Sequence, residues 1–72
     1  INIHTMKLRD LEKIIRPHNV IITPPKRGGS HWIAVRGKVS VVVASSEGLK
    51  GEILPFYAKR VYKAFNIERN GN

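Results

Sequence analysis

Three histidines are the side chains best suited to moving protons, because imidazole changes its charge near neutral pH. His4 lies before the only methionine, in a segment, Ile1–Thr5, that we expect to be a leader or a cloning remnant. His18 follows a proline, as residues of a connector often do. His31 directly follows a glycine-containing loop and opens an expected strand, so it is the candidate catalytic residue. The alternative is a strand-edge histidine that only hydrogen-bonds a neighbour.

Metal and nucleophile chemistry find less support in the sequence. No two of these histidines have the spacing of metal ligands with a carboxylate beside them, and the chain has no cysteine, so we expect no metal site. Ser30 would be a nucleophile only beside a general base oriented by a third group, and no acidic residue is placed to complete that arrangement.

Positive charge is the strongest feature of the composition. The 72 residues include 13 lysines and arginines against 5 aspartates and glutamates, a net charge of +8. A small basic domain most often binds a polyanion, and nucleic acid is the commonest one. Six cations lie in a carboxylate-free segment between Glu12 and Glu47: Lys13, Arg16, Lys26, Arg27, Arg36 and Lys38. From charge alone, a solvated rim and a phosphate-binding surface both fit.

The loop before His31 favours the phosphate-binding interpretation, since glycines let backbone N–H groups approach an anion closely. We expect the hairpin turn to bring Arg36 and Lys38 near the same sheet edge, and we expect like charges on a last helix, Lys59 and Lys63, to gain from an anion. The candidate RNA- and phosphate-binding residues are therefore Lys26, Arg27, Gly28, Gly29, Ser30, Arg36, Lys38, Lys59 and Lys63.

Helical periodicity is found near both ends of the chain. A first helix is expected from Met6 to Ile15, with Thr5 as N-cap, because Pro17 ends it and keeps Arg16 out of helical geometry. Its apolar stripe consists of Leu8, Leu11, Ile14 and Ile15. A second helix is expected from Pro55, with Asn66 as C-cap and Glu68–Asn72 frayed. Its apolar stripe consists of Tyr57, Ala58, Val61, Ala64 and Phe65.

Between the helices the sequence predicts three strands, Val20–Thr23, His31–Val35 and Val39–Ala44, with a hairpin turn at Arg36–Lys38 and a loop at Leu49–Leu54. The expected fold is one α+β domain over residues 1–72, ordered α-β-β-β-α, with two helices on one face of a three-stranded antiparallel sheet. Apolar residues occur on both faces of these strands. The open face would therefore pack against a terminus or await a protein partner.

Aromatic side chains fit the core better than a base-binding surface. Trp32 could stack on a base, but a lone tryptophan in a domain of this size is more often core, and Tyr57, Tyr62 and Phe65 have helical spacing. The apolar runs are far shorter than the roughly 20 residues of a membrane helix. We expect a cytoplasmic protein that does not bind membranes.

The segment Gly29-Ser30-His31-Trp32, which enters a strand from a basic glycine loop, resembles the glycine-serine-histidine signature of the HicA toxins. These are small messenger-RNA interferases with a double-stranded-RNA-binding-domain-like fold. The resemblance extends from about Met6 to Ile67 and includes the closing segment Val61–Ile67. It implies the toxin of a type II toxin–antitoxin system, with His31 as the catalytic histidine. It also implies messenger RNA and a HicB-type antitoxin as partners, and no small-molecule cofactor.

The chemistry of RNA cleavage suits these residues, because the 2′-hydroxyl of RNA is its own nucleophile and no metal is required. His31 would move protons, and Lys26 and Arg27 would stabilise the phosphorane. An alternative is a non-catalytic double-stranded RNA- or DNA-binding module, which predicts salt-sensitive binding without cleavage. A third possibility is a structural basic protein of a larger particle.

Overall fold

The computed structural model describes residues 6–67. The expected leader, the expected N-cap Thr5 and the expected fraying of residues 68–72 lie outside these residues. The elements, in chain order, are β1 (Met6–Lys7), α1 (Leu8–Ile15), the 3₁₀ turn η1 (Arg16–His18), β2 (Ile21–Thr23), β3 (His31–Arg36), β4 (Val39–Ala44), the 3₁₀ turn η2 (Gly48–Lys50), β5 (Glu52–Ile53) and α2 (Pro55–Ala64).

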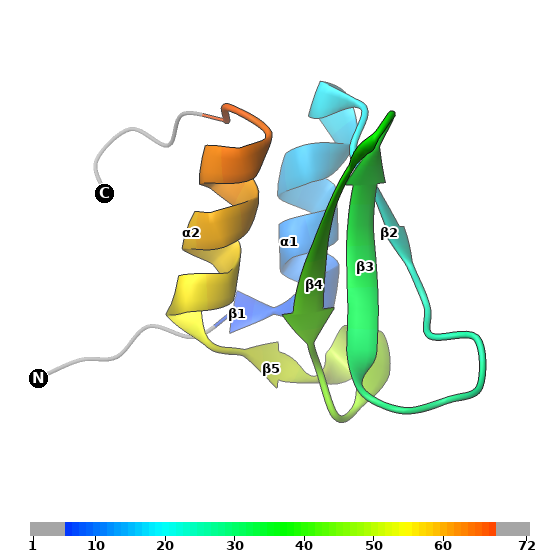
Figure 1. The fold of residues 1–72 in the computed structure, drawn as a ribbon. Coiled ribbons are helices and arrows are strands. Elements are labelled where there is room, and N and C mark those ends of the chain that lie inside the picture. Colours follow the sequence, from blue (N-terminus) through cyan, green and yellow to red (C-terminus); the bar gives the residue numbers. More distant parts are fainter. Residues whose placement is uncertain (1–5, 68–72) are drawn as a thin grey trace, which may run out of the picture.

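The main sheet is antiparallel and has the strand order β2-β3-β4. Figure 1 shows α1 and α2 side by side on one face of this sheet, so the molecule has one helical layer and one sheet layer. The expected small α+β domain with a three-stranded antiparallel sheet and two helices is confirmed. The other face of β2, β3 and β4 is not covered by any element of residues 6–67.

Strand alternation sorts the side chains between these two faces. Ile22, Ala34, Val41 and Val43 are buried beneath the helices. Trp32 lies on the same side of β3 and packs against this core half-buried, which confirms it as a core residue. The next residues along each strand point outward, and among them Ile21 is 66% exposed and Val42 is 42% exposed.

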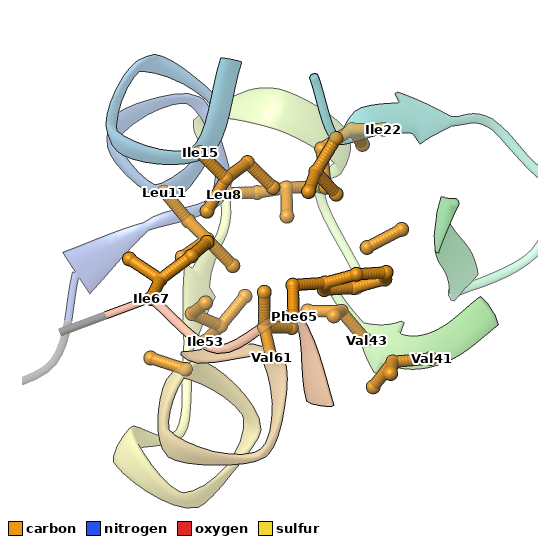
Figure 2. Packing of buried hydrophobic residues seen from close by; sticks show 13 residues of the cluster. Leu8, Leu11, Ile15, Ile22, Val41, Val43, Ile53, Val61, Phe65 and Ile67 are labelled. Carbon is orange, nitrogen blue, oxygen red and sulfur yellow. The ribbon is translucent and has the colours of Figure 1, made fainter. Parts of the chain in front are cut away.

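The core lies between the sheet and the helices. Phe65, just after α2, is fully buried in it, and Figure 2 shows its side chain near Val43 of the sheet and Val61 of the helix. Leu8, Leu11 and Ile15 are fully buried, while Ile14 packs at the margin, so the expected stripe of α1 is confirmed.

The beginning of α1 differs from the prediction. Met6 and Lys7 do not start the helix but form β1, which pairs with Ile53 and Glu52 of β5 in the segment expected to be a loop. The helix begins at Leu8, where the backbone N–H of Lys7 donates to Asp10 Oδ2 over 3.4 Å. Strands of two residues have too little local pattern to be recognised in a sequence, because only their pairing defines them.

The ends of the other elements lie within a residue or two of the prediction. Helix α1 ends at Ile15, before Pro17, as expected. Helix α2 ends at Ala64, with Phe65 as C-cap and Asn66 one position further, in a left-handed conformation at φ 59°. The N–H groups of Asn66 and Ile67 donate to the carbonyls of Lys63 and Tyr62, a Schellman ending in which asparagine replaces the usual glycine.

Candidate functional site

His31 is the first residue of β3 and is exposed on the face of the sheet away from the helices. Its main chain is held in the ladder opposite Ala44 of β4. One residue earlier, the carbonyl of Ser30 accepts a 2.7 Å hydrogen bond from the N–H of Ser45. The backbone on which the imidazole sits is therefore fixed, while its side chain remains open to a ligand.

A compact turn, residues 45–51, supports this strand entry. The buried hydroxyl of Ser45 donates to the carbonyl of Gly48 over 2.6 Å, and the N–H of Gly51 donates to the same carbonyl over 3.0 Å. A Cβ on Gly51 would lie 2.5 Å from Ser45 Oγ, so the turn has no room for a side chain there. Through Gly51, whose carbonyl accepts from Leu8, the turn also joins the start of α1.

The loop that precedes His31 exposes both cations and bare backbone. Lys26 and Arg27 are exposed, and Gly28 and Gly29 follow at φ +75° and +107°, values that disfavour any other residue. No atom lies within 4 Å of where their Cβ atoms would be. An anion can therefore approach the main chain of this loop and the two cations together, directly before His31.

Arg36 and Lys38 are not near His31, which corrects the expectation that the hairpin brings them to the same edge. Arg36 ends β3, five residues after His31, and at about 3.3 Å per residue the two are separated by roughly 16 Å. Its guanidinium donates to the carbonyl of His18 over 3.1 Å and to that of Phe65 over 3.2 Å, and it lies 5.4 Å from the centre of the Phe65 ring. This arginine connects β3 to the ends of both helical segments.

The lysines of α2 are also separate from His31. Lys59 and Lys63 are exposed on the helical layer, whereas His31 faces outward from the sheet. Of the six cations in the carboxylate-free segment, Arg16 forms an ion pair with Glu12 at 3.2 Å. Of the cations predicted to bind phosphate, Lys26 and Arg27 are the two in the loop that leads into β3, four and five residues before His31.

Sequence reasoning missed the residues that fix the site rather than those that would react. Gly51 was expected only as part of the loop Leu49–Leu54, and its close approach to Ser45, six residues earlier, had no local signal in the sequence. Within residues 6–67 there is no group of three metal-ligating side chains.

None of the helices in the described part of the chain is long and apolar enough to span a bilayer. Comparison of the chain with models of protein families, with curated proteins and with solved structures finds no match.

Proposed function

We propose that this chain is a metal-independent endoribonuclease that resembles the HicA messenger-RNA interferases, with His31 as its catalytic residue. The observation that carries the proposal is the placement of His31. It is exposed, its backbone is fixed by β4 and by the Ser45–Ser30 hydrogen bond, and it follows a basic turn with uncovered backbone. A side chain able to transfer protons thus directly follows, along the chain, a loop whose cations and exposed backbone are suited to an anion.

The proposed reaction uses the nucleophile that RNA contains. His31 accepts the proton of the 2′-hydroxyl, the 2′ oxygen attacks the adjacent phosphorus, and the bond from phosphorus to the 5′ oxygen breaks. The proton is then returned to the leaving 5′ oxygen, which gives a 2′,3′-cyclic phosphate and a 5′-hydroxyl. Lys26, Arg27 and the N–H groups of the glycine turn stabilise the extra negative charge of the phosphorane.

One exposed histidine supports a modest rate. General acid–base catalysis by a positioned side chain contributes a factor of about 10² to 10⁴. The open site adds no enclosure that would exclude water. Such a rate suits an enzyme that acts on few messages in a cell.

The resemblance also leads us to propose a HicB-type antitoxin as partner, which would cover His31. The outward face of the sheet is the surface that we propose the antitoxin covers. The exposed Ile21 and Val42 lie on this face together with His31. Burial of this apolar area would favour a complex. Coexpression with the neighbouring reading frame should give a stable complex, and the protein purifying alone without toxicity would contradict this.

The decisive test compares the wild-type protein with His31→Ala on a labelled RNA in the presence of EDTA. We expect the wild type to cut the RNA and the variant to cut it at least about 100 times more slowly. Replacement of the ribose at the cut position by 2′-deoxyribose should stop cleavage there. A binding module would instead bind RNA with equal affinity in both proteins and cut it in neither.

A cellular test separates the same alternatives. Expression of the wild-type chain should arrest growth, and expression of His31→Ala at the same level should not. Equal arrest by both chains would show that His31 is not the source of toxicity. Wild-type and variant proteins with the same melting temperature would exclude misfolding as the cause of a difference.

A further inference from the structure

One face of α2 combines an exposed aromatic ring with three cations. At 3.6 residues per turn, Phe56, Lys59, Arg60 and Lys63 fall within an arc of about 100°. All four are exposed, and Phe56 is 46% exposed. The opposite side of the helix carries the buried Ala58 and Val61, so this charged face points away from the core.

The ring of Phe56 is supported from within the protein. Its centre lies 4.0 Å from the ring centre of Tyr57, and the two planes are tilted by 32°. Tyr57 is itself partly buried and packs against the core. Contact with an anchored ring restricts Phe56, which lowers the entropy that it would lose when a ligand stacks on its free side.

The charge on this face has no compensation within α2. The helix contains no acidic residue, and among residues 6–67 neither Lys59, Arg60 nor Lys63 forms an ion pair. Lys59 and Lys63 are one turn apart and repel each other. A ligand with several negative charges would remove this repulsion.

We propose that the face formed by Phe56, Lys59, Arg60 and Lys63 binds single-stranded nucleic acid, with a base stacked on Phe56 and phosphates on the cations. Aromatic rings alternating with cations are how single strands are held without sequence preference. The inference rests on the proposed function for the identity of the anion and deepens it by assigning the strandedness of the substrate.

The position of α2 favours a single strand over a duplex. Helix α2 and the loop before His31 lie on opposite sides of the molecule (Figure 1). A stiff duplex follows one surface, whereas a flexible single strand can contact α2 and continue around the sheet to His31. A protein partner fits this face less well, because lysine is depleted in the centres of protein interfaces.

The test measures binding of a labelled oligothymidylate of about 15 nucleotides to the His31→Ala protein. The probe is DNA because a strand without 2′-hydroxyls lacks the nucleophile for cleavage. Phe56→Leu keeps an apolar side chain but removes the stacking surface, and we expect it to weaken binding about 5- to 100-fold. Phe56→Trp should bind at least as tightly as phenylalanine. Lys59→Gln and Lys63→Gln should each lower the salt dependence by about 0.7 in log–log slope.

Leu54→Ala is the matched control, because Leu54 is 55% exposed and lies just before α2 but has no ring. It should leave binding within about twofold. Equal losses from Leu54→Ala and Phe56→Leu would indicate a general apolar patch, and an unchanged affinity of Phe56→Leu would overturn the inference.

The two proposals fail separately. If Phe56→Leu binds oligothymidylate normally while His31→Ala abolishes RNA cleavage, the α2 site is wrong and the enzyme stands. If the protein cuts no RNA but Phe56→Leu loses binding, the α2 site is supported and the protein is a nucleic-acid-binding module rather than an enzyme. A preference of the protein for duplex over single strand that Phe56→Leu leaves unchanged would also overturn the α2 site.

Discussion

Each end of β3 carries a basic side chain, but the one at the start is exposed and the one at the end is held by hydrogen bonds to the main chain. At its start, His31 is exposed, and nothing in residues 6–67 is shown to hydrogen-bond its imidazole. At its end, the Arg36 guanidinium donates to two carbonyls from η1 and from the end of α2. Only five residues separate a side chain available for chemistry from one that the fold uses.

The difference teaches how positive charge should be interpreted in a small basic domain. A guanidinium whose donors are given to main-chain carbonyls has fewer left for a phosphate. Exposed cations beside bare glycine backbone, such as Lys26 and Arg27, keep theirs. The local surroundings of each cation, and not its distance from His31 in sequence, decide which of them keep hydrogen-bond donors free for an anionic ligand.

The largest expected effect is at the start of β3. His31→Ala should reduce RNA cleavage by a factor of about 10² to 10⁴. Because the side chain is exposed, the free energy of unfolding should change by less than about 0.5 kcal/mol. Cleavage rates and urea unfolding of the two proteins check this. A large loss of stability would mean that His31, like Arg36, serves the fold.

Gly51→Ala should have the next largest effect, a loss of stability, because Gly51 lies in the turn that holds the start of β3. A Cβ 2.5 Å from Ser45 Oγ forces the turn to shift, which should cost about 1–3 kcal/mol of unfolding free energy. Thermal unfolding measures this. Ser45→Ala in the same protein removes the obstructing oxygen, so the double variant should lose less stability than the sum of the single losses. If the two losses of stability simply add in the double variant, the close approach of position 51 to Ser45 Oγ is wrong.

Arg36→Ala should affect stability and spare cleavage. Loss of its two exposed or half-buried hydrogen bonds and of its contact with Phe65 should cost about 1 kcal/mol, which lowers the melting temperature by roughly 4–8 °C. Cleavage measured well below that temperature should stay within about twofold. If Arg36 instead binds RNA, cleavage falls while the melting temperature is unchanged.

The smallest expected effect is a change in the salt dependence of RNA binding when the loop cations are replaced. Lys26→Gln and Arg27→Gln together should lower the log–log salt dependence of single-stranded RNA binding by about 1.4, or 0.7 per cation, without changing stability. Lys38→Gln, at the far end of β3, is the control and should leave the slope unchanged. An equal change from Lys38→Gln would show that charge acts over the whole surface.

Local patterns predicted the elements that contain them. The stripe Leu8, Leu11 and Ile15 and the strand pattern around Ala34 and Val41 each have enough residues to show a period, so α1, β3 and β4 follow from the sequence. The β1–β5 pair could not be predicted, since it depends on contact between Met6 and Ile53. The exposed His31 was predictable as a candidate from its type and its loop.

The role of Arg36 was out of reach for a related reason. Its partners lie 18 and 29 residues away, so no spacing in the sequence distinguishes it from Lys38. The support given to His31 by Ser45 and Gly51 likewise depends on how the chain folds back after β4. Sequence patterns thus indicate which residues can react, and only the tertiary structure shows which of the others hold them.

The hydrogen bond from Ser45 to Ser30 has a consequence for following the site in solution. The Ser45 amide is buried, and its proton can exchange with solvent deuterium only when the start of β3 separates from the end of β4. Its exchange rate therefore measures how often the backbone beneath His31 opens. The exchange of this single amide resonance therefore reports, without any substrate, whether the backbone at the site is closed.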